Sequence, residues 1–308
     1  MRDLTEPVSG LDAALRAGRF VVTAELTSPP GADPGSVRRR ARLLRGHVVA
    51  ANVPDGQAVS AHMAPLAAAR LLLDEGLEPV LTLQCRDRNR LALQSDLIGA
   101  ASLGAANVLC LTGDAPSPGS PIPGVFDLDS VGLLRAAGGL MAGRFLDRGT
   151  LRAPPRLLLG AAAHPFAEQR ADRIERLRAK AVAGARFVQT QYVFDVPGFA
   201  AWLDELHAAG IDRDLAILAS TGPLRSPRVL DFVRRLAGVH IPAAIEHRLA
   251  GLDGEAFARE SLAICAETAA ALAALPGVAG IHLLAPYWEQ SIPEIIAMAG
   301  LAGRTVRA

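Results

Sequence analysis

Short apolar runs that alternate with longer amphipathic segments constrain this chain more than any other feature of its sequence. Each run is rich in β-branched residues and stops at a polar or turn residue, and most are followed by apolar positions at helical spacing, as from Leu66 to Leu73. Several helical segments stop at a glycine, which takes the left-handed conformation of a helix end, at Gly76, Gly104, Gly184 and Gly210. Eight apolar runs are present, at residues 20–26, 47–53, 78–84, 106–112, 157–163, 187–191, 215–220 and 280–285.

Eight units of strand and helix are the number that closes a parallel barrel, whereas an open doubly wound sheet usually has about six strands. We therefore predict an α/β fold, a (β/α)8 TIM barrel, in which residues 1–308 form a single domain. The connection between the seventh and eighth runs is too long for one helix. Its patterns at residues 241–251 and 255–275 predict two or three extra helices there.

Composition excludes several classes of function. Lys and Arg number 32 against 31 Asp and Glu, so nothing in the net charge favours a nucleic-acid partner. The three cysteines lack CxxC spacing, which argues against a disulfide framework and against a metal site and favours a reducing cytoplasm. The first ten residues do not resemble a signal peptide, and Pro276, Gly277 and Gly280 interrupt the most apolar window, so we expect no membrane span.

Polar residues stand at or just after six of the predicted strands. In parallel barrels the site lies at the C-terminal ends of the strands, so these residues are candidates for it: Glu25, Asn52, Gln84, Asp114, His164 and Gln191.

A second interpretation stays open for each of these residues, because a polar side chain at a strand end often only caps the next helix. His164, before Pro165, fits a helix start, and Lys180 fits a solvated helix face. Glu25 differs, since a carboxylate on a barrel strand is costly to bury unless it is paired, protonated or catalytic. Gln189 and Gln191 have the same parity, so at least one should point into the barrel.

Two further observations narrow the function. The connection from Gly113 to Asp127 is rich in proline and glycine, too stiff for a helix and long enough to be an active-site loop. Motifs of serine hydrolases, zinc proteases and nucleoside triphosphatases are missing, and GGLMAG at residues 138–143 is not a strand-to-helix turn of the dinucleotide-binding kind.

Five segments together resemble the methylenetetrahydrofolate reductase family, from about Phe20 to Glu294. They are AELTSPPG around Glu25, CRDRNRLALQSDLIGAASLGAANVLCLTGD from Cys85, AAAHP at His164, KAVAGARFVQTQYVFD from Lys180, and GIHLLAPYWEQSIPEI from Gly280. The CRDRN segment is typical of a short bacterial-type form of the family.

The resemblance implies a cytoplasmic, flavin-dependent oxidoreductase that interconverts 5,10-methylenetetrahydrofolate and 5-methyltetrahydrofolate. It implies flavin adenine dinucleotide at the strand ends, NADH or NADPH as reductant, and a homo-oligomer. Glu25 matches the general acid that protonates N10 of the folate, and Asp114 matches the aspartate that tunes the flavin.

The remaining matches divide between cofactor and substrate. The cofactor set is Asn52, Gln84, Thr112, Gly113, Asp114, His164 and Lys180, and the substrate set is Glu25, Gln191, Tyr192 and Phe232. Thr112 stands where the family often has an arginine; Arg86 and Arg88 either supply that charge or form a salt network at a helix start.

Two alternatives remain open. One is a folate- or flavin-binding subunit that serves a partner redox protein or a corrinoid methyltransferase and has no NAD(P)H activity of its own. The other is a pterin-binding methyltransferase barrel, which would transfer a methyl group without redox change.

Overall fold

The computed structural model describes residues 6–56, 60–116, 119–167, 170–213 and 215–303. Eight parallel strands form a closed barrel in chain order, and β8 pairs back onto β1. The strands are β1 (Val21–Glu25), β2 (Ala50–Val53), β3 (Glu78–Gln84), β4 (Asn107–Leu111), β5 (Leu158–Ala163), β6 (Phe187–Tyr192), β7 (Ala216–Thr221) and β8 (Val278–Leu283). Each predicted run overlaps one strand, so the (β/α)8 barrel is confirmed.

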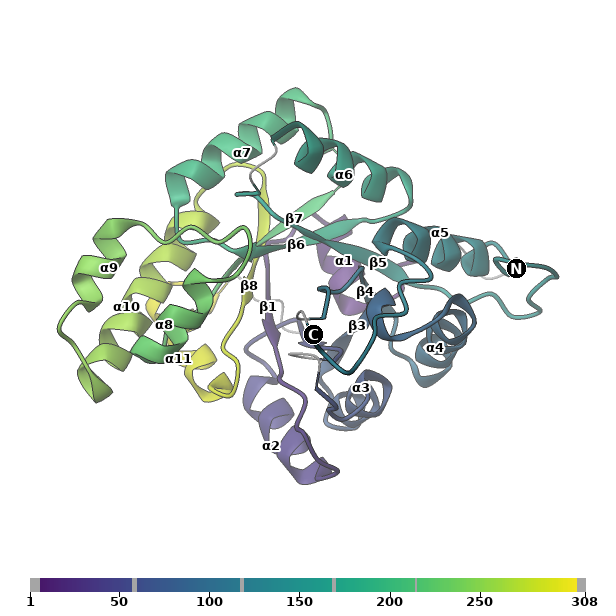
Figure 1. Cartoon of the computed structure of the whole chain (residues 1–308), viewed down its shortest axis with the longest axis horizontal. Helices are drawn as coiled ribbons and strands as arrows, with labels where there is room; N and C mark the ends of the chain where they lie inside the picture. Colours follow the sequence, from purple (N-terminus) through teal and green to yellow (C-terminus); the bar gives the residue numbers. More distant parts are fainter. Residues whose placement is uncertain (1–5, 57–59, 117–118, 168–169, 214, 304–308) are drawn as a thin grey trace.

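Helices surround the barrel (Figure 1). They are α1 (Gly10–Arg16), α2 (Pro34–Leu44), α3 (Pro65–Asp74), α4 (Arg90–Leu103), α5 (Ser130–Met141), α6 (Arg170–Val182), α7 (Val196–Ala208), α8 (Pro227–Arg234), α9 (Ala243–Leu249), α10 (Gly254–Ala273) and α11 (Ile292–Met298), with short 3₁₀ turns η2 (Cys85–Asp87) and η3 (Glu289–Ser291). Three helices, α8 to α10, lie between β7 and β8, as predicted.

Local chemistry explains where these helices begin and end. Asp33, Asn89 and Asp129 each accept a hydrogen bond from a backbone N–H of the first turn of α2, α4 and α5. All four glycines predicted at helix ends have positive φ, between 66° for Gly210 and 113° for Gly184. The segment GGLMAG, excluded above as a dinucleotide-binding turn, lies at the end of α5 and just beyond it.

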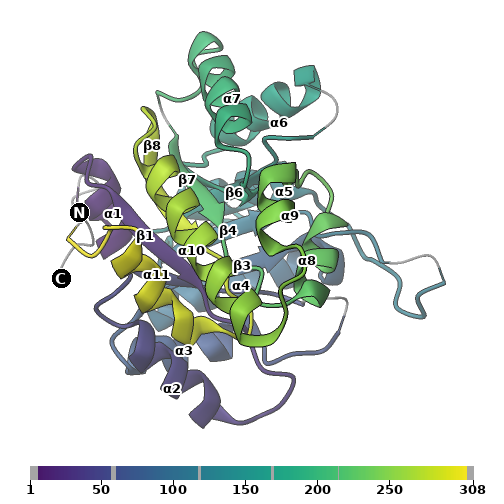
Figure 2. The ribbon, with the colours of Figure 1, turned by 90° about the vertical axis from the view of Figure 1, so that its left-hand side faces the viewer.

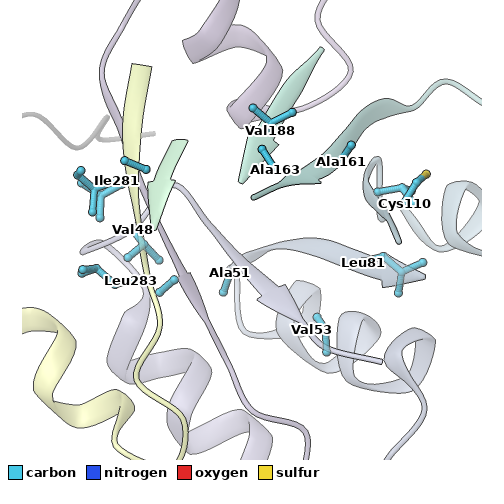
Figure 3. Packing of buried hydrophobic residues seen from close by; sticks show 14 of the residues in the cluster. Val48, Ala51, Val53, Leu81, Cys110, Ala161, Ala163, Val188, Ile281 and Leu283 are labelled. Atoms are coloured by element: carbon cyan, nitrogen blue, oxygen red, sulfur yellow. The ribbon is translucent and has the colours of Figure 1, made fainter. Parts of the chain in front are cut away.

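Side chains that alternate along the strands build two separate apolar layers. The inward-facing set closes the bottom of the barrel and includes Val21, Leu109, Phe187 and Leu218, packed against Leu11 of α1. Figure 2 shows α1 on one side of the barrel, with α8 and α9 on the opposite side. The outward-facing set packs the strands against the helices, and Figure 3 shows part of it, including the labelled side chains Leu81, Cys110, Val188 and Ile281.

The extra helices have an apolar cluster of their own. Phe257 and Ile264 of α10, Leu230 of α8 and Ile245 of α9 pack with Tyr192 and Phe194 at the end of β6. The insertion therefore supports one side of the C-terminal rim of the barrel. Within the described part of the chain, no helix is both long and apolar enough to cross a membrane.

Candidate active site at the barrel mouth

Glu25 is the last residue of β1 and points into the barrel at its C-terminal end. Glu25 pairs in register with Asn52 on β2. Two residues earlier on the same strand, Thr23 pairs with His282 on β8. Burial, and then the charge of Glu289, raise the pKa of Glu25 from 4.5 to about 7. At neutral pH this carboxyl therefore holds a proton in a large fraction of molecules, as a general acid requires.

Glu289 is a second carboxyl at the mouth, and it is fixed from two sides. Its Oε1 accepts hydrogen bonds from the backbone N–H of Thr27 at 2.9 Å and from Nη1 of Arg40 on α2 at 2.9 Å. The residue is 1% exposed. It ties the loop after β8 to the loop after β1, and so places a negative charge near Glu25.

A buried polar layer lies inside the barrel between the apolar floor and the mouth. Asn52 and Gln189 exchange two amide hydrogen bonds of 2.6 and 3.0 Å. The Nδ1 atom of His282 lies 2.9 Å from Oγ1 of Thr23 and 3.3 Å from Nε2 of Gln189. Burial lowers the pKa of His282 to about 3, so the imidazole is neutral. Asn52, predicted to bind cofactor, thus has its amide engaged inside the barrel.

The end of β6 departs from regular alternation. Gln189 pairs with Leu218 of β7, but Tyr192 pairs with Ser220, so β6 holds one extra residue. Gln189 is inside the barrel, as parity required of at least one of the two glutamines. Gln191 is displaced by the bulge and is half-buried, with Oε1 accepting from the backbone N–H of Tyr192 at 3.0 Å.

Tyr192, the last residue of β6, lies near Glu25. It is 8% exposed, and its hydroxyl donates to the carbonyl of Leu284 at 3.3 Å. Burial and the neighbouring Glu25 raise the pKa of the phenol. Tyr192 therefore lies near Glu25 and is hydrogen-bonded to Gln191, whereas Phe232 lies on α8 with 57% of its surface exposed.

At the ends of β3 and β4 the backbone of Gly113 passes close to the side chain of Gln84. Gly113 has φ of 88°, and a Cβ atom there would lie 2.6 Å from Oε1 of Gln84. Gln84 donates to the carbonyl of Asp55 through Nε2. Thr112 accepts a hydrogen bond from the N–H of Ser130 at 3.0 Å, so its hydroxyl serves the start of α5.

Positive charge gathers after β5. His164 lies exposed at the strand end; partial desolvation and the nearby Lys180 lower its pKa, while Asp114 acts in the opposite direction. Lys180 is the only lysine in the chain, and its Nζ donates to the carbonyl of Ala162 at 2.8 Å. Burial and then Arg176 lower the pKa of Lys180. Lys180 is thus half-buried near a second cation and is not a fully solvated side chain.

Arg86 and Arg88 form a salt network. Arg86 binds Asp87 at 2.7 Å, and Arg88 binds Asp55 at 2.5 Å and Asp96 at 2.8 Å. All of these residues except Asp96 line a pocket of about 320 Å³ outside the ends of β2 and β3. Its lining also includes His62, Met63 and Ile122 but neither Glu25 nor Gln191. The Gly113 to Asp127 connection contacts this network, because Val125 N–H donates to the carbonyl of Arg86 at 2.6 Å. Residues 117 and 118 of that connection lie outside the described residues.

Other chemistries find little support in the geometry. All three cysteines are buried and unpaired. Burial raises the pKa of the Cys85 thiol to about 12 and also raises those of Cys110 and Cys265, which disfavours thiolate chemistry. Among the described residues, no three His, Cys, Asp or Glu side chains are grouped as a metal site would need.

Sequence reasoning did not single out Glu289, Arg40 or His282. Glu289 follows a turn and meets Thr27, which is 262 residues away in sequence, so no local pattern marks it. His282 carried a usable signal, because inward parity on the eighth strand places it in the barrel.

Comparison with known proteins identifies the family. The family model described as methylenetetrahydrofolate reductase matches residues 10–300. The chain belongs to the methylenetetrahydrofolate reductase family. The 5,10-methylenetetrahydrofolate reductase of Salmonella typhimurium is 28% identical over 185 residues, which cover 60% of this chain and 57% of that reductase. A probable methylenetetrahydrofolate reductase (NADPH) of Caenorhabditis elegans is 26% identical over 236 residues, or 76% of this chain and 34% of that protein.

These reductases are longer than the part they share with this chain, which spans 57% of the Salmonella protein and 34% of the nematode one. A solved structure of similar fold comes from Clostridium thermocellum, with a TM-score of 0.68 at 15% identity over 94% of this chain and 97% of that one. That protein is described as binding two copies of 5-methyl-5,6,7,8-tetrahydrofolic acid.

Proposed function

We propose that this member of the methylenetetrahydrofolate reductase family interconverts 5,10-methylenetetrahydrofolate and 5-methyltetrahydrofolate with a flavin and NADH or NADPH. The observation that carries the proposal is Glu25, a carboxyl with a pKa of about 7 at the mouth of the barrel, next to Tyr192. The folate bound by the Clostridium thermocellum protein supports the same substrate class.

Glu25 supplies the acid chemistry. Opening the methylene bridge of the folate requires a proton on N10, and a carboxyl that is half protonated at neutral pH can deliver it. Burial, and then the negative charge of Glu289, keep the proton on Glu25, while Arg40 balances the charge of Glu289 itself. The amide of Gln191 can both donate to and accept from the pterin edge.

The residues on the opposite side of the mouth suit flavin adenine dinucleotide. Lys180 and Arg176 place positive charge together, which suits the two phosphates of the cofactor, and His164 lies near Lys180 as a hydrogen-bonding group. Gly113 has a positive φ, and a Cβ atom there would collide with the Gln84 side chain, so the backbone can turn at this point of the mouth only with glycine. We expect Gly113, Asp114, His164 and Lys180 to hold the cofactor, which when bound accepts hydride from the nicotinamide and delivers it to the folate.

The folate-binding subunit is the second candidate, and one observation favours it. Thr112 stands where the family often has an arginine, and its hydroxyl is committed to Ser130, so one cofactor contact is missing at this position. A subunit of this kind would bind folate and leave the redox chemistry to a partner protein.

A spectrum and an assay of the purified chain separate the two candidates. We expect a flavin spectrum, a released flavin on denaturation, NAD(P)H oxidation with an artificial acceptor, and conversion of methylenetetrahydrofolate. Glu25→Gln is the matched control, which should keep the spectrum and lose the conversion. A chain that binds folate but oxidises NAD(P)H only when a second polypeptide is added would support the subunit, and a chain that binds neither flavin nor folate would overturn both proposals.

A further inference from the structure

The bulge in β6 lies in its pairing with β7. Toward β5 the register is regular, with Ala162 opposite Gln189 and Ala163 opposite Thr190. Toward β7, three steps along β6 from Gln189 to Tyr192 face two steps from Leu218 to Ser220. Regular alternation would place Gln191 beside Ser220, and the bulge gives that place to Tyr192.

The hydroxyl of Thr190 fills the gap that the bulge leaves in the hydrogen-bond ladder. It accepts from the backbone N–H of Ser220 at 2.9 Å and donates to the carbonyl of Gln191 at 2.8 Å. Thr190 is 5% exposed and Ser220 is fully buried. Without the hydroxyl a buried N–H would lose its acceptor, and β6 would gain by returning to regular pairing with β7.

The same bulge sets two neighbouring residues at the mouth. The Oε1 atom of the Gln191 amide accepts a hydrogen bond from the backbone N–H of Tyr192 at 3.0 Å. This bond fixes the orientation of the amide, whose NH2 group is the hydrogen-bond donor on the other side. Tyr192 reaches the carbonyl of Leu284 and lies close to Glu25. In a regular strand these two side chains would point to opposite faces.

We propose that Thr190 is a positioning residue, whose hydroxyl maintains the bulge that presents Gln191 and Tyr192 together at the mouth and so controls recognition of the folate through Gln191. The inference rests on the proposed function for the identity of the ligand. It does not rest on it for the geometry, which can be tested without any ligand.

Thr190→Val removes the hydroxyl and keeps the shape of the side chain, whereas Thr190→Ser keeps the hydroxyl. We expect Thr190→Val to raise the Kd for 5-methyltetrahydrofolate about tenfold, the equivalent of one hydrogen bond, and Thr190→Ser to stay within about twofold of the wild type. Thr268→Val is the matched control, because Thr268 is a buried threonine of α10 whose hydroxyl donates to the carbonyl of Ile264. It should leave the Kd unchanged.

A double-mutant cycle separates positioning from a general structural effect. If Thr190 acts through Gln191, Thr190→Val should weaken binding little further once Gln191→Ala is present. An equal loss in both backgrounds would overturn the inference. Should Thr190→Val fail to fold, Thr190→Ala takes its place in the cycle.

A crystal structure of the Thr190→Val variant tests the geometry directly. We expect a regular β6 and a displaced Gln191. An unchanged bulge with Gln191 in place would overturn the inference, whether or not the protein binds folate. Failure of the wild type to bind 5-methyltetrahydrofolate would instead overturn the proposed function.

Discussion

The Glu289 carboxyl lies near enough to Glu25 to add to the effect of burial, and together they bring the pKa of Glu25 to about 7. Glu289 is itself held by Arg40 of α2 and by the backbone of Thr27. Burial and one carboxylate that is held in place therefore raise the pKa of a second carboxyl, and of these residues only Glu25 lies at the end of a barrel strand.

Glu25→Gln should separate the two half-reactions. The amide keeps the shape of the side chain but cannot donate a proton, so reduction of the folate should slow roughly a hundredfold or more, the usual scale of general acid catalysis. Flavin content and flavin reduction by NAD(P)H should change little, since neither needs a proton on N10. Anaerobic stopped-flow measurement of both half-reactions checks this. Equal slowing of both would mean that Glu25 organises the site, and no slowing of either would mean that the acid lies elsewhere.

Glu289→Gln should move the pH dependence of the folate half-reaction. An acid must be protonated to act, so the wild-type rate should be full below the pKa of Glu25 and fall as the pH rises through about 7. Removal of the negative charge at Glu289 lowers that pKa, so the falling limb should shift to lower pH.

The double variant Arg40→Gln/Glu289→Gln is the control for this shift, because it also removes the cation that the single variant leaves without its buried partner. In the double variant, the pH at which the rate falls should lie between the values for the wild type and the single variant. A limb that does not move in Glu289→Gln would show that Glu289 does not act on the catalytic acid.

Lys180→Met should weaken flavin binding. Loss of one charged hydrogen bond to a phosphate corresponds to roughly a tenfold to hundredfold rise in Kd. Fluorescence titration with flavin adenine dinucleotide measures it. Arg178→Met on the exposed face of the same helix is the matched control and should change the Kd little. Equal affinities for the Lys180 variant and the wild type would remove Lys180 from the cofactor set.

Gly160→Ala should destabilise the floor of the barrel. A Cβ atom at Gly160 would lie 2.2 Å from the ring of Phe187, so the ring must move, at a cost of about 1–3 kcal/mol in the free energy of unfolding. Urea denaturation checks this, with Phe187→Leu expected to cost less in the Gly160→Ala background than alone. Gly99→Ala on α4 is the control, since its Cβ would meet only Leu66, at 3.8 Å. A Gly160→Ala variant as stable as the wild type would show that the floor has room for the methyl group.

The architecture was readable from local sequence because its signals are local. β-Branched runs such as residues 78–84 favour strands, and glycines such as Gly104 end helices, whatever lies elsewhere in the chain. The same logic placed Glu25, Gln84 and Gln191 at strand ends, and parity required at least one of Gln189 and Gln191 to point into the barrel, which the structure shows to be Gln189. The interpretation of residues 1–308 as one domain and the role of Phe232 stay predictions.

Three features of the site were determined by the tertiary structure, because each depends on a residue that is remote in sequence. The displacement of Gln191 depends on how β6 pairs with Ser220 of β7, since a strand holds a bulge only against its neighbour. Asn52 turns its amide inward because Gln189, 137 residues away, satisfies it there. Local sequence sets which side chains can do acid and amide chemistry, but closure of the barrel alone buries Glu25 and brings Glu289 close to it, and these two effects raise the pKa of that carboxyl.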